Sequence, residues 1–304
     1  MNATSVTLPA LAKVNLFLRV LARENDGFHG IETLLCLVSL ADTLQAERRE
    51  GHGVTIEVSG ADVGPAEQNL AVRAATAVLE AVGHRFAIHL TLTKRIPVRA
   101  GLGGGSSDAA AALHAANFLA GNPIPRHELV QLAARLGSDV PFFCTGAPLA
   151  LAWNRGERML RLPPLPSAPA LLLTPRVSVA TAEAYAWVDA ARQSAGRRGA
   201  VALDLDAVSG WGDIARMAGN DFESAVFGRH ADVRAAFEAL VGTRPLLCRM
   251  SGSGSTLFAI YRSARDRDDA AMMLGRKHGV LTPTETLATP APGPEPVSAP
   301  TESG

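Results

Sequence analysis

Alternation of hydrophobic and polar residues over the first hundred positions predicts a series of β-strands. The longest stretch is 6–21, VTLPALAKVNLFLRVL, which we interpret as one or two strands with a break near Pro9. Further strands are expected over 33–47, 53–60 and 86–97, because β-branched and aliphatic residues there lie between turn-forming glycines.

Apolar positions recurring every three or four residues predict helices between and after these strands. The helices are expected over 69–82, 107–119, 126–136, 181–193 and 265–279, with two or three more between 211 and 241. Residues 140–153 form an apolar run that we interpret as strand-like, and 170–175 and 246–261 predict further strands. Helices and strands that mix without regular alternation favour an α+β fold over a doubly wound sheet.

A proline-rich stretch divides the chain. Residues 161–169, RLPPLPSAP, contain four prolines in nine positions and mark a domain crossover. We therefore expect an N-terminal domain over 1–160 and a C-terminal domain over 161–284. Residues 285–304 are rich in proline and poor in large apolar side chains, so a disordered tail is expected there.

The stretch 94–112, KRIPVRAGLGGGSSDAAAA, carries the strongest chemical signal. Glycines 101, 103, 104 and 105 remove side chains from the backbone, so that its N–H groups can approach a ligand closely. Ser106 is the predicted N-cap of the helix that follows, whose unpaired N–H groups and dipole favour an anion. This arrangement is typical of a phosphate-binding loop.

Two better-known phosphate loops do not fit this spacing. The P-loop requires a Lys before its Ser or Thr, and here Gly105 precedes Ser106. The dinucleotide fingerprint G-x-G-x-x-G would need glycine at position 106 and an apolar strand upstream, so a dehydrogenase is the less favoured enzyme class. The pair His127–Glu128 begins like a zinc motif, but its fifth residue is Gln131.

Charge and composition exclude several other classes of protein. The chain has 304 residues with 29 Lys+Arg against 29 Asp+Glu, which removes the basic character of a nucleic-acid binder. Aromatic content is only 5%, too low for base-stacking platforms. Three scattered cysteines, the lack of a signal peptide and the lack of a long apolar run predict a cytoplasmic protein outside the membrane. The oligomeric state is left open.

Lys13 and Asp139 are candidates for chemistry near the glycine loop. Taken singly, Lys13 is typical of an edge strand and Asp139 of a turn. A phosphoryl-transfer site, however, needs a cation for the moving phosphate and an acceptor for the proton of the attacking alcohol. The glycine loop between them therefore favours a functional role for both.

Several motifs together resemble the GHMP kinase superfamily. They are PALAKVNLFLRV with DGFH close behind, NLAVRAA, KRIPVRAGLGGGSSDAAA, LGSDVPFF and RMSGSGSTLFA, in the order of the superfamily. The resemblance implies an N-terminal domain like the second domain of ribosomal protein S5 and a C-terminal ferredoxin-like α/β sandwich. It also implies ATP and Mg²⁺ as cofactors.

The AKVNLFL and DGFH pair narrows the implied reaction to a small-molecule kinase of the non-mevalonate isoprenoid precursor pathway. Its substrate would be a cytidine diphosphate-linked sugar alcohol, phosphorylated on the 2-hydroxyl of the methylerythritol part. The alternatives are a GHMP kinase for another small alcohol, such as homoserine or mevalonate, and a nucleotide-binding protein without activity.

The same resemblance implies roles for individual residues. Asp139 would be the base and Lys13 its charged neighbour. ATP would be bound by Asn69 and by the loop Pro97, Val98, Arg99, Ala100, Gly101, Leu102, Gly103, Gly104, Gly105, Ser106 and Ser107. The substrate would contact Asn15, Phe28, His29, Thr181, Tyr185, Gly252, Ser253 and Gly254. Phe28 is at a position where many members of the superfamily have tyrosine. The resemblance does not assign the magnesium ligands; Ser107 is the one residue suggested for that role.

Overall fold

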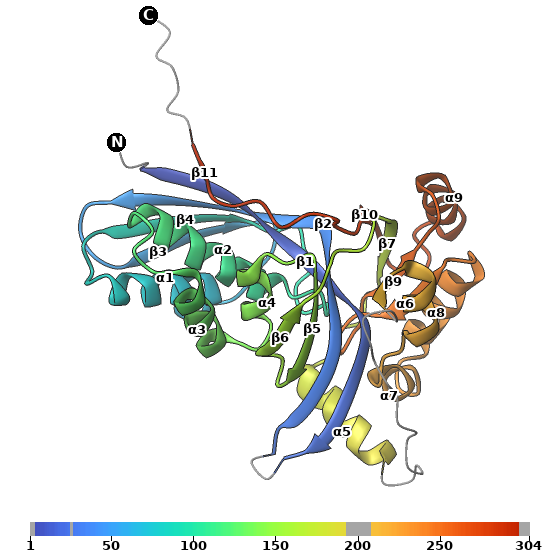
Figure 1. The fold of residues 1–304 in the computed structure, drawn as a ribbon. Helices are drawn as coiled ribbons and strands as arrows, with labels where there is room; N and C mark the ends of the chain where they lie inside the picture. Colours follow the sequence, from blue (N-terminus) through green and yellow to red (C-terminus); the bar gives the residue numbers. More distant parts are fainter. Residues whose placement is uncertain (1–3, 25–26, 193–207, 298–304) are drawn as a thin grey trace, which may run out of the picture.

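The protein is described by a computed structural model that covers residues 4–24, 27–192 and 208–297. In that part of the chain the strands form one seven-stranded and one four-stranded sheet, with helices outside both. Figure 1 shows the two sheets side by side, joined where the long strands β1 and β2 pass between them. The predicted α+β class is confirmed.

The first sheet is built around a long antiparallel hairpin of β1 (Ser5–Arg23) and β2 (His29–Arg49). One end of this hairpin lies in the body of the sheet, and the other projects away from it beside α5 (Thr181–Arg192). The remaining strands of the sheet are β3 (Val54–Ser59), β4 (Ala87–Thr93), β5 (Leu149–Asn154), β6 (Arg158–Arg161) and β11 (Glu295–Pro296). All pairings are antiparallel except β3 with β4.

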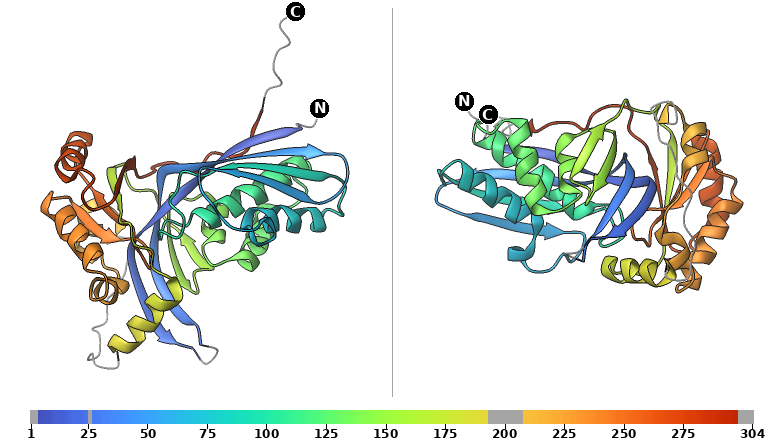
Figure 2. Two further views of the ribbon diagram at one scale, coloured as in Figure 1. Left: turned by 180° about the vertical axis from the view of Figure 1, so that it is seen from behind. Right: turned by 60° about the horizontal axis from the view of Figure 1, so that its bottom comes forward.

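The helices between β3 and β5 pack against one face of this sheet (Figure 2). They are α1 (Leu70–Ala81), α2 (Gly104–Leu119), α3 (Arg126–Leu136) and α4 (Val140–Thr145), with a short 3-10 turn at Ala66–Gln68. The alanines of α2 let this helix approach both α1 and the sheet closely, and most of its residues are buried. The glycine loop at its N-terminus is thereby fixed against the core.

The second sheet has the order β10-β7-β9-β8 and is antiparallel throughout. Its strands are β7 (Pro169–Thr174), β8 (Leu247–Met250), β9 (Leu257–Ile260) and β10 (Val280–Glu285). One buried cluster joins this sheet to α5, α7 (Phe222–Phe227), α8 (Ala231–Gly242) and α9 (Ala264–Leu274), and a second cluster joins it to α6 (Trp211–Met217). Ala12, Val14 and Leu16 of β1 share one buried cluster with Leu172 and Phe258 of this sheet. Side chains alternate along a strand, so Lys13 and Asn15 point to the face of β1 opposite to Ala12, Val14 and Leu16. That face is also covered, and both side chains are buried.

Pro9 does not break β1, which runs without interruption past it. Its pairing with β11 is confined to Val6 and Thr7, so Pro9 lies where the other side of β1 has no partner strand. A residue without an N–H group is tolerated at such an edge. The register of β1 against β2 shifts instead at three later places, between Leu11 and Ala12, between Asn15 and Phe17, and between Val20 and Arg23.

The strand-like interpretation of 140–153 is wrong for its first part. Residues Val140–Thr145 form α4, and only Leu149–Asn154 form a strand. The residues of α4 are nearly all buried, and a short apolar run buried on all sides has no periodicity that separates a helix from a strand. Pro141 in the first turn is a helix-start signal that fits the observed structure.

The predicted N-cap Ser106 is also wrong. Helix α2 begins at Gly104, and its N-cap is Gly103 with φ 72° in the left-handed region. This conformation is accessible to glycine without steric cost, and it turns the chain into the helix earlier than a serine cap would. Ser106 therefore lies within the first turn.

The expected disordered tail is wrong for the residues that the structure describes. After β10, the chain returns across the first sheet, held by backbone bonds from Leu287 N to Leu37 O (3.1 Å) and from Ala291 N to Gly146 O (2.9 Å). The segment ends in β11, which pairs with β1. The composition predicted disorder because the segment has few large apolar side chains to bury. A prediction from composition does not include the backbone hydrogen bonds that hold this segment. Residues 298–304 lie outside the described part, and the domain boundary after residue 160 stays a prediction.

Candidate active site

Two adjoining cavities meet at the glycine loop. The larger, about 760 Å³, is lined by Lys13 and is called the Lys13 cavity. The smaller, about 300 Å³, is lined by Asn69 and is called the Asn69 cavity. Gly101, Gly103 and Ser106 line both cavities, so a ligand in one can reach a ligand in the other across this loop.

Close packing explains why two of the loop positions are glycine. Gly101 has φ 81°, and a Cβ there would lie 2.1 Å from the carbonyl oxygen of Ser251. At Gly103 a Cβ would lie 2.8 Å from Cζ of Phe143. Both positions combine a left-handed backbone with a contact that a side chain would block, so any larger residue would displace the loop.

The first turn of α2 presents free backbone N–H groups to the Asn69 cavity. The first hydrogen bond of the helix runs from Ser107 N to Gly103 O, at 2.9 Å. The N–H groups of Gly104, Gly105 and Ser106, which precede it, therefore have no partner within the helix. A Cβ on Gly105 would meet no protein atom within 4 Å, so this position faces open space. Free N–H groups and the positive end of a 16-residue helix together form an anion-binding site.

Lys13 and Asp139 face each other in the Lys13 cavity. Nζ of Lys13 lies 3.6 Å from Oδ2 of Asp139 and donates a hydrogen bond of 2.6 Å to Oδ1 of Asn15. Asn15 in turn donates to Thr33 Oγ1 (2.8 Å), which fixes its amide orientation. The backbone N–H of Lys13 bonds to Leu102 O at 3.0 Å, so β1 carries the ammonium directly beside the glycine loop.

Asp139 immediately precedes α4 but does not cap it. Its side chain accepts no hydrogen bond from the helix N–H groups and is 33% exposed, whereas the side chain of Lys13 is 5% exposed. The carboxylate is therefore available to a ligand in the cavity, and Lys13 supplies the neighbouring positive charge. A carboxylate paired with a buried ammonium can accept a proton from an alcohol and stabilise charge on a phosphate.

Lys94, which the sequence prediction did not single out, forms a buried triad with Asp42 and Asp108 behind the loop. Nζ of Lys94 donates to both carboxylates, at 2.6 Å for Asp108. Asp42 also accepts the backbone N–H of Ile96 at 2.8 Å, whereas Oδ1 of Asp108 has no partner in the described structure. Burial is the main reason that the pKa of Asp108 is raised to about 7; Lys94 lowers it and the charge of Asp42 raises it.

The far end of the Lys13 cavity is aromatic. The imidazole of His29 stacks on the ring of Tyr185 with centroids 5.0 Å apart, and its Nε2 lies 2.7 Å from Oδ1 of Asp189. The Phe28 ring is 59% exposed and has the guanidinium of Arg155 4.4 Å from its centroid. Burial, followed by the charge of Asp139, raises the pKa of Tyr185 to about 12, which keeps its hydroxyl protonated at neutral pH.

The loop between β8 and β9 of the second sheet closes the site. Ser251 Oγ donates to Gly101 O at 2.9 Å, and the hydroxyl of Ser253 lies 3.0 Å from that of Thr181. Asn220, which the sequence prediction did not include, donates from Nδ2 to the carbonyl oxygens of Met250 and Gly252. These bonds hold the loop from both sides.

Most of the residues expected from the sequence line these two cavities. The Asn69 cavity is lined by Asn69, Pro97, Val98, Arg99, Ala100, Gly101, Gly103, Gly104, Gly105 and Ser106. The Lys13 cavity is lined by Lys13, Asn15, Phe28, His29, Asp139, Thr181, Tyr185, Gly252 and Ser253. Leu102, Ser107 and Gly254 line neither cavity. Leu102 and Ser107 are buried, and Oδ1 of Asn69 caps α1 by accepting the N–H of Ala71.

The oxygen ligands near the loop are few. Among the described residues, no group of three or more His, Cys, Asp or Glu side chains could hold a metal ion. Ser106 and Asp139 both line the Lys13 cavity, whereas Ser107 is turned to the interior because the helix begins at Gly104. This arrangement fits Mg²⁺, which is commonly held by one or two protein oxygens together with phosphates and water.

Comparison with known proteins agrees with this geometry. Residues 69–147 match the family model described as the GHMP kinases N terminal domain, and residues 200–280 match GHMP kinases C terminal. In the described part of the chain, no helix is long and apolar enough to cross a membrane.

Similar whole proteins include two curated kinases. The 4-diphosphocytidyl-2-C-methyl-D-erythritol kinase of Solibacter usitatus is 40% identical over 88% of this chain and 85% of its own length. The kinase of the same name from Paraburkholderia phytofirmans is 38% identical over 87% of this chain and 88% of its own length.

Solved structures extend the comparison to the fold. A crystal structure of 4-(cytidine 5'-diphospho)-2C-methyl-D-erythritol kinase has a TM-score of 0.77 and 35% identity, covering 92% of this chain and 98% of that one. Homoserine kinase from Cytophaga hutchinsonii has a TM-score of 0.67 at 20% identity, with 96% and 97% covered, and shares the fold. The predicted GHMP kinase fold is therefore confirmed, and the chain belongs to the 4-diphosphocytidyl-2-C-methyl-D-erythritol kinase family of the GHMP kinases.

Proposed function

We propose that this protein transfers the γ-phosphoryl group of ATP to the 2-hydroxyl of 4-diphosphocytidyl-2-C-methyl-D-erythritol, a step of the non-mevalonate isoprenoid precursor pathway. The observation that carries the proposal is the position of the Lys13–Asp139 pair, which faces the cavity that adjoins the anion-binding loop. The names of the relatives at 38–40% identity support this choice of substrate.

In this proposal the Asn69 cavity holds the nucleotide. The free N–H groups of the first turn of α2 bind its phosphates, and the apolar side chains of Leu70 and Val98, which line the same cavity, contact the base. The γ-phosphate then lies near Gly103 and Ser106, which both cavities share. That position is next to Lys13.

The chemistry requires little more than positioning and charge. Asp139 accepts the proton of the 2-hydroxyl as the oxygen forms a bond to the γ-phosphorus, and the bond between that phosphorus and the bridging oxygen of ADP breaks. Lys13 lies 3.6 Å from the Asp139 carboxylate and offsets the negative charge of the phosphoryl oxygens. The products are ADP and the phosphorylated sugar alcohol.

Mg²⁺, when bound with ATP, would offset charge on the phosphates. Ser106 and Asp139 are the residues that we propose to hold it, because their oxygens line the space beside the loop. Lys94 takes no part in this binding, since its ammonium is already shared by two carboxylates.

The cytidine end of the substrate lies, in this proposal, at the aromatic end of the Lys13 cavity. Tyr185 and Phe28 offer flat surfaces from two different parts of the chain, and His29 offers a polar edge between them. Stacking on such rings contributes about 1–3 kcal/mol per base in nucleic-acid complexes. His29 covers one face of the Tyr185 ring, so in this proposal the cytosine lies beside the imidazole that Asp189 holds in place.

An ADP-release assay tests the proposal. The purified protein is supplied with ATP, Mg²⁺ and one of three alcohols: the diphosphocytidyl substrate, mevalonate or homoserine. We expect release with the first alone. Release with mevalonate or homoserine would favour a GHMP kinase of different specificity, and release with none of the three would reject a kinase for these alcohols.

We also propose a cytoplasmic location. Cys36, Cys144 and Cys248 are all free thiols buried in the protein, as expected in a reducing compartment. The proposed partners are small molecules, with no nucleic acid and no membrane.

A further inference from the structure

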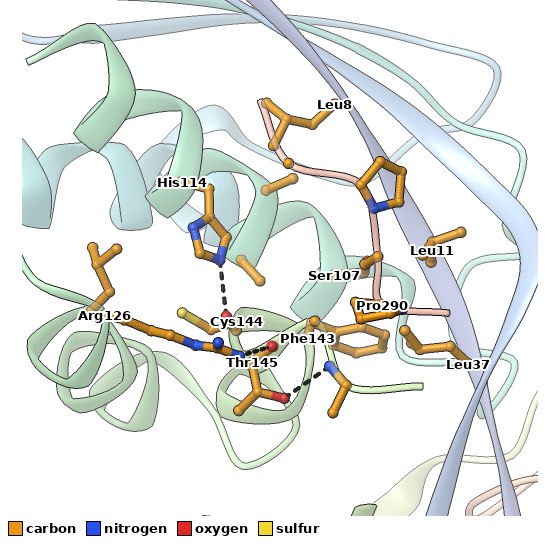
Figure 3. Close-up of a pocket in the computed structure, with 18 of the residues that line it drawn as sticks. Leu8, Leu11, Leu37, Ser107, His114, Arg126, Phe143, Cys144, Thr145 and Pro290 are labelled. Atoms are coloured by element: carbon orange, nitrogen blue, oxygen red, sulfur yellow. Dashed lines mark hydrogen bonds between the residues drawn. The ribbon is translucent and has the colours of Figure 1, made fainter. Parts of the chain in front are cut away.

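A third cavity, of about 720 Å³, lies on the other side of α2 from the nucleotide loop. It is enclosed by α2, α3 and α4, by the start of β1, and by the C-terminal segment around Pro290, as Figure 3 shows. We call it the Phe143 cavity. It shares no lining residue with the Lys13 or Asn69 cavities, so it is a separate compartment.

The walls of the Phe143 cavity are largely apolar. Leu8, Leu11 and Leu37 from the first sheet face Phe143 of α4 across it, and Pro290 of the C-terminal segment adjoins them (Figure 3). A cavity of a few hundred Å³ with apolar walls and a few polar groups is the usual form of a small-molecule site.

The ionisable side chains of this cavity have one sign of charge. Arg126, Arg161 and His114 line it, and no Asp or Glu does. Both arginines are exposed, and neither forms an ion pair among the described residues. Arg126 donates to the carbonyl oxygen of Thr145 (Figure 3). Burial and then the charge of Arg126 lower the pKa of His114, which keeps the imidazole from adding a buried charge.

One wall of the Phe143 cavity is also a support of the active site. A Cβ on Gly103 would lie 2.8 Å from Phe143 Cζ, so the phenyl ring rests directly against the glycine loop. Helix α4, which carries Phe143, begins at the residue after Asp139. A ligand that moves Phe143 therefore moves the loop, the base or both.

From these contacts we propose that the Phe143 cavity binds a small anionic amphiphile and that its occupancy lowers the kinase activity. The apolar body of the ligand lies among the leucines and prolines, and its anionic head lies at Arg126 and Arg161. Arginine suits this role because its guanidinium binds carboxylate and phosphate groups through paired hydrogen bonds. Binding at this cavity does not depend on which alcohol the enzyme phosphorylates.

Calorimetry with simple probes tests the binding. Octyl phosphate and octanoate carry the proposed chemistry with two different heads, while octyltrimethylammonium and octanol carry the same chain with a cationic or neutral head. We expect both anions to bind, each saturably, below their micellar concentrations. If the anion with the phosphate head binds and octanoate does not, the ligand is an organic phosphate; the reverse result indicates a carboxylic acid. Equal binding of the cationic probe would overturn the proposal.

Exposed arginines allow variants that leave the core intact. The double variant Arg126→Gln with Arg161→Gln should weaken binding of the preferred anion about tenfold, the effect expected when charged hydrogen-bond partners are removed. Arg135→Gln, on the same helix α3 but outside the cavity, is the matched control and should bind like the wild type. Unchanged binding by the double variant would contradict the proposed position of the head.

Activity provides the second measurement. We expect the bound anion to lower kcat in the wild type and to have little effect on the double variant, whose basal activity stays normal because neither arginine contacts the active site. Inhibition that persists in the double variant, or that is relieved by excess ATP, would place the probe at the nucleotide loop and overturn the proposal.

Discussion

Nε2 of His29 lies 2.7 Å from Oδ1 of Asp189, although 160 positions separate the two residues in the sequence. His29 begins β2 at the projecting end of the hairpin, and Asp189 belongs to α5, which lies beside that end (Figure 1). The side chain of His29 is only 6% exposed and is also stacked on Tyr185. The contact therefore joins the hairpin to α5 at the proposed cytidine end of the site and holds the imidazole in one orientation.

Asp189→Asn should raise KM for the diphosphocytidyl substrate. The carboxylate is the acceptor that fixes which ring nitrogen of His29 carries the proton, and an amide can present a donor to the same nitrogen. A hydrogen bond to a charged group contributes about 1.5–3 kcal/mol, so we expect KM to rise about tenfold or more. Steady-state kinetics should show kcat and KM for ATP nearly unchanged.

Glu183→Gln is the control for this variant. It removes the same charge from the same helix, but Glu183 is exposed and does not line the Lys13 cavity. An equal rise in KM for Glu183→Gln would indicate a general electrostatic effect of α5, and the positioning role of Asp189 would have to be abandoned.

Asp139→Asn should reduce kcat by about 10²–10⁴-fold, the usual contribution of a general base. Calorimetry should show that ATP still binds, because the variant keeps the shape of the residue and leaves the loop intact. Lys13→Ala should also lower kcat, since the moving phosphoryl group loses its cation.

A matched control exists for Asp139→Asn. Asp213 has a side chain 31% exposed against 33% for Asp139, and it lies on α6 outside both cavities. Asp213→Asn should turn over at the wild-type rate. Turnover near the wild-type rate in a folded Asp139→Asn variant would assign Asp139 to the turn before α4 and not to catalysis.

Gly105→Val should weaken ATP binding without unfolding the protein. A Cβ at this position meets no atom outside its own stretch of helix within 4 Å, and the side chain extends into the space proposed for phosphate. Loss of one charged hydrogen bond to phosphate would weaken binding about tenfold or more. Calorimetric titration with ATP measures the effect, and thermal unfolding checks the fold.

Two other glycines make this experiment specific. Gly104→Val is expected to weaken ATP binding too, but its Cβ would lie 3.1 Å from Ile96 Cγ2, so the fold is also disturbed. Gly242→Val, in α8 with open space around it, is the control for a helical glycine and should bind ATP normally. If Gly105→Val binds ATP as tightly as Gly242→Val does, the loop is a connector and not the phosphate site.

The parts of the site that could be predicted from the sequence are those formed by residues that lie next to one another in the chain. The glycine loop and its helix form one continuous stretch, so their local conformation follows from the residues of that stretch. Lys13 and Asp139 could be proposed because each lies in a recognisable motif. Asp189 could not be found in this way, since its role depends on the packing of α5 against a hairpin far away in the sequence.

The Lys94 triad illustrates the same limit. Lys94 and Asp108 flank the glycine loop in the sequence, but Asp42 lies 52 positions before Lys94 and reaches it only through the pairing of β2 with β4. Charged residues in a sequence are usually exposed, so burial of three of them together has no signal in composition or periodicity. The opposite error occurred for the segment 286–297, where a proline-rich composition predicted disorder but backbone hydrogen bonds hold the chain.

This triad predicts how the stability of the protein depends on pH. The pKa of Asp108 is raised from an ordinary value of 3.8 to about 7, with burial as the largest cause. Between these two values the folded protein keeps a proton that the unfolded chain has released, and protonation favours the folded state. As the pH rises from about 4 to about 7 this advantage is lost, so the free energy of unfolding should fall across that window.

Asp108→Asn removes the titration while keeping the size of the side chain and an oxygen that can accept from Lys94. Urea unfolding at pH 5 and pH 8 should show that the variant becomes more stable relative to the wild type at the higher pH. Each unit of pKa difference is worth about 1.4 kcal/mol, so the relative gain should be on the order of 1–3 kcal/mol. Asp232→Asn, an exposed change on α8, should follow the wild type at both values. The same stability difference between Asp108→Asn and the wild type at pH 5 and pH 8 would mean that Asp108 is ionised throughout, with Lys94 outweighing both its burial and its neighbour Asp42.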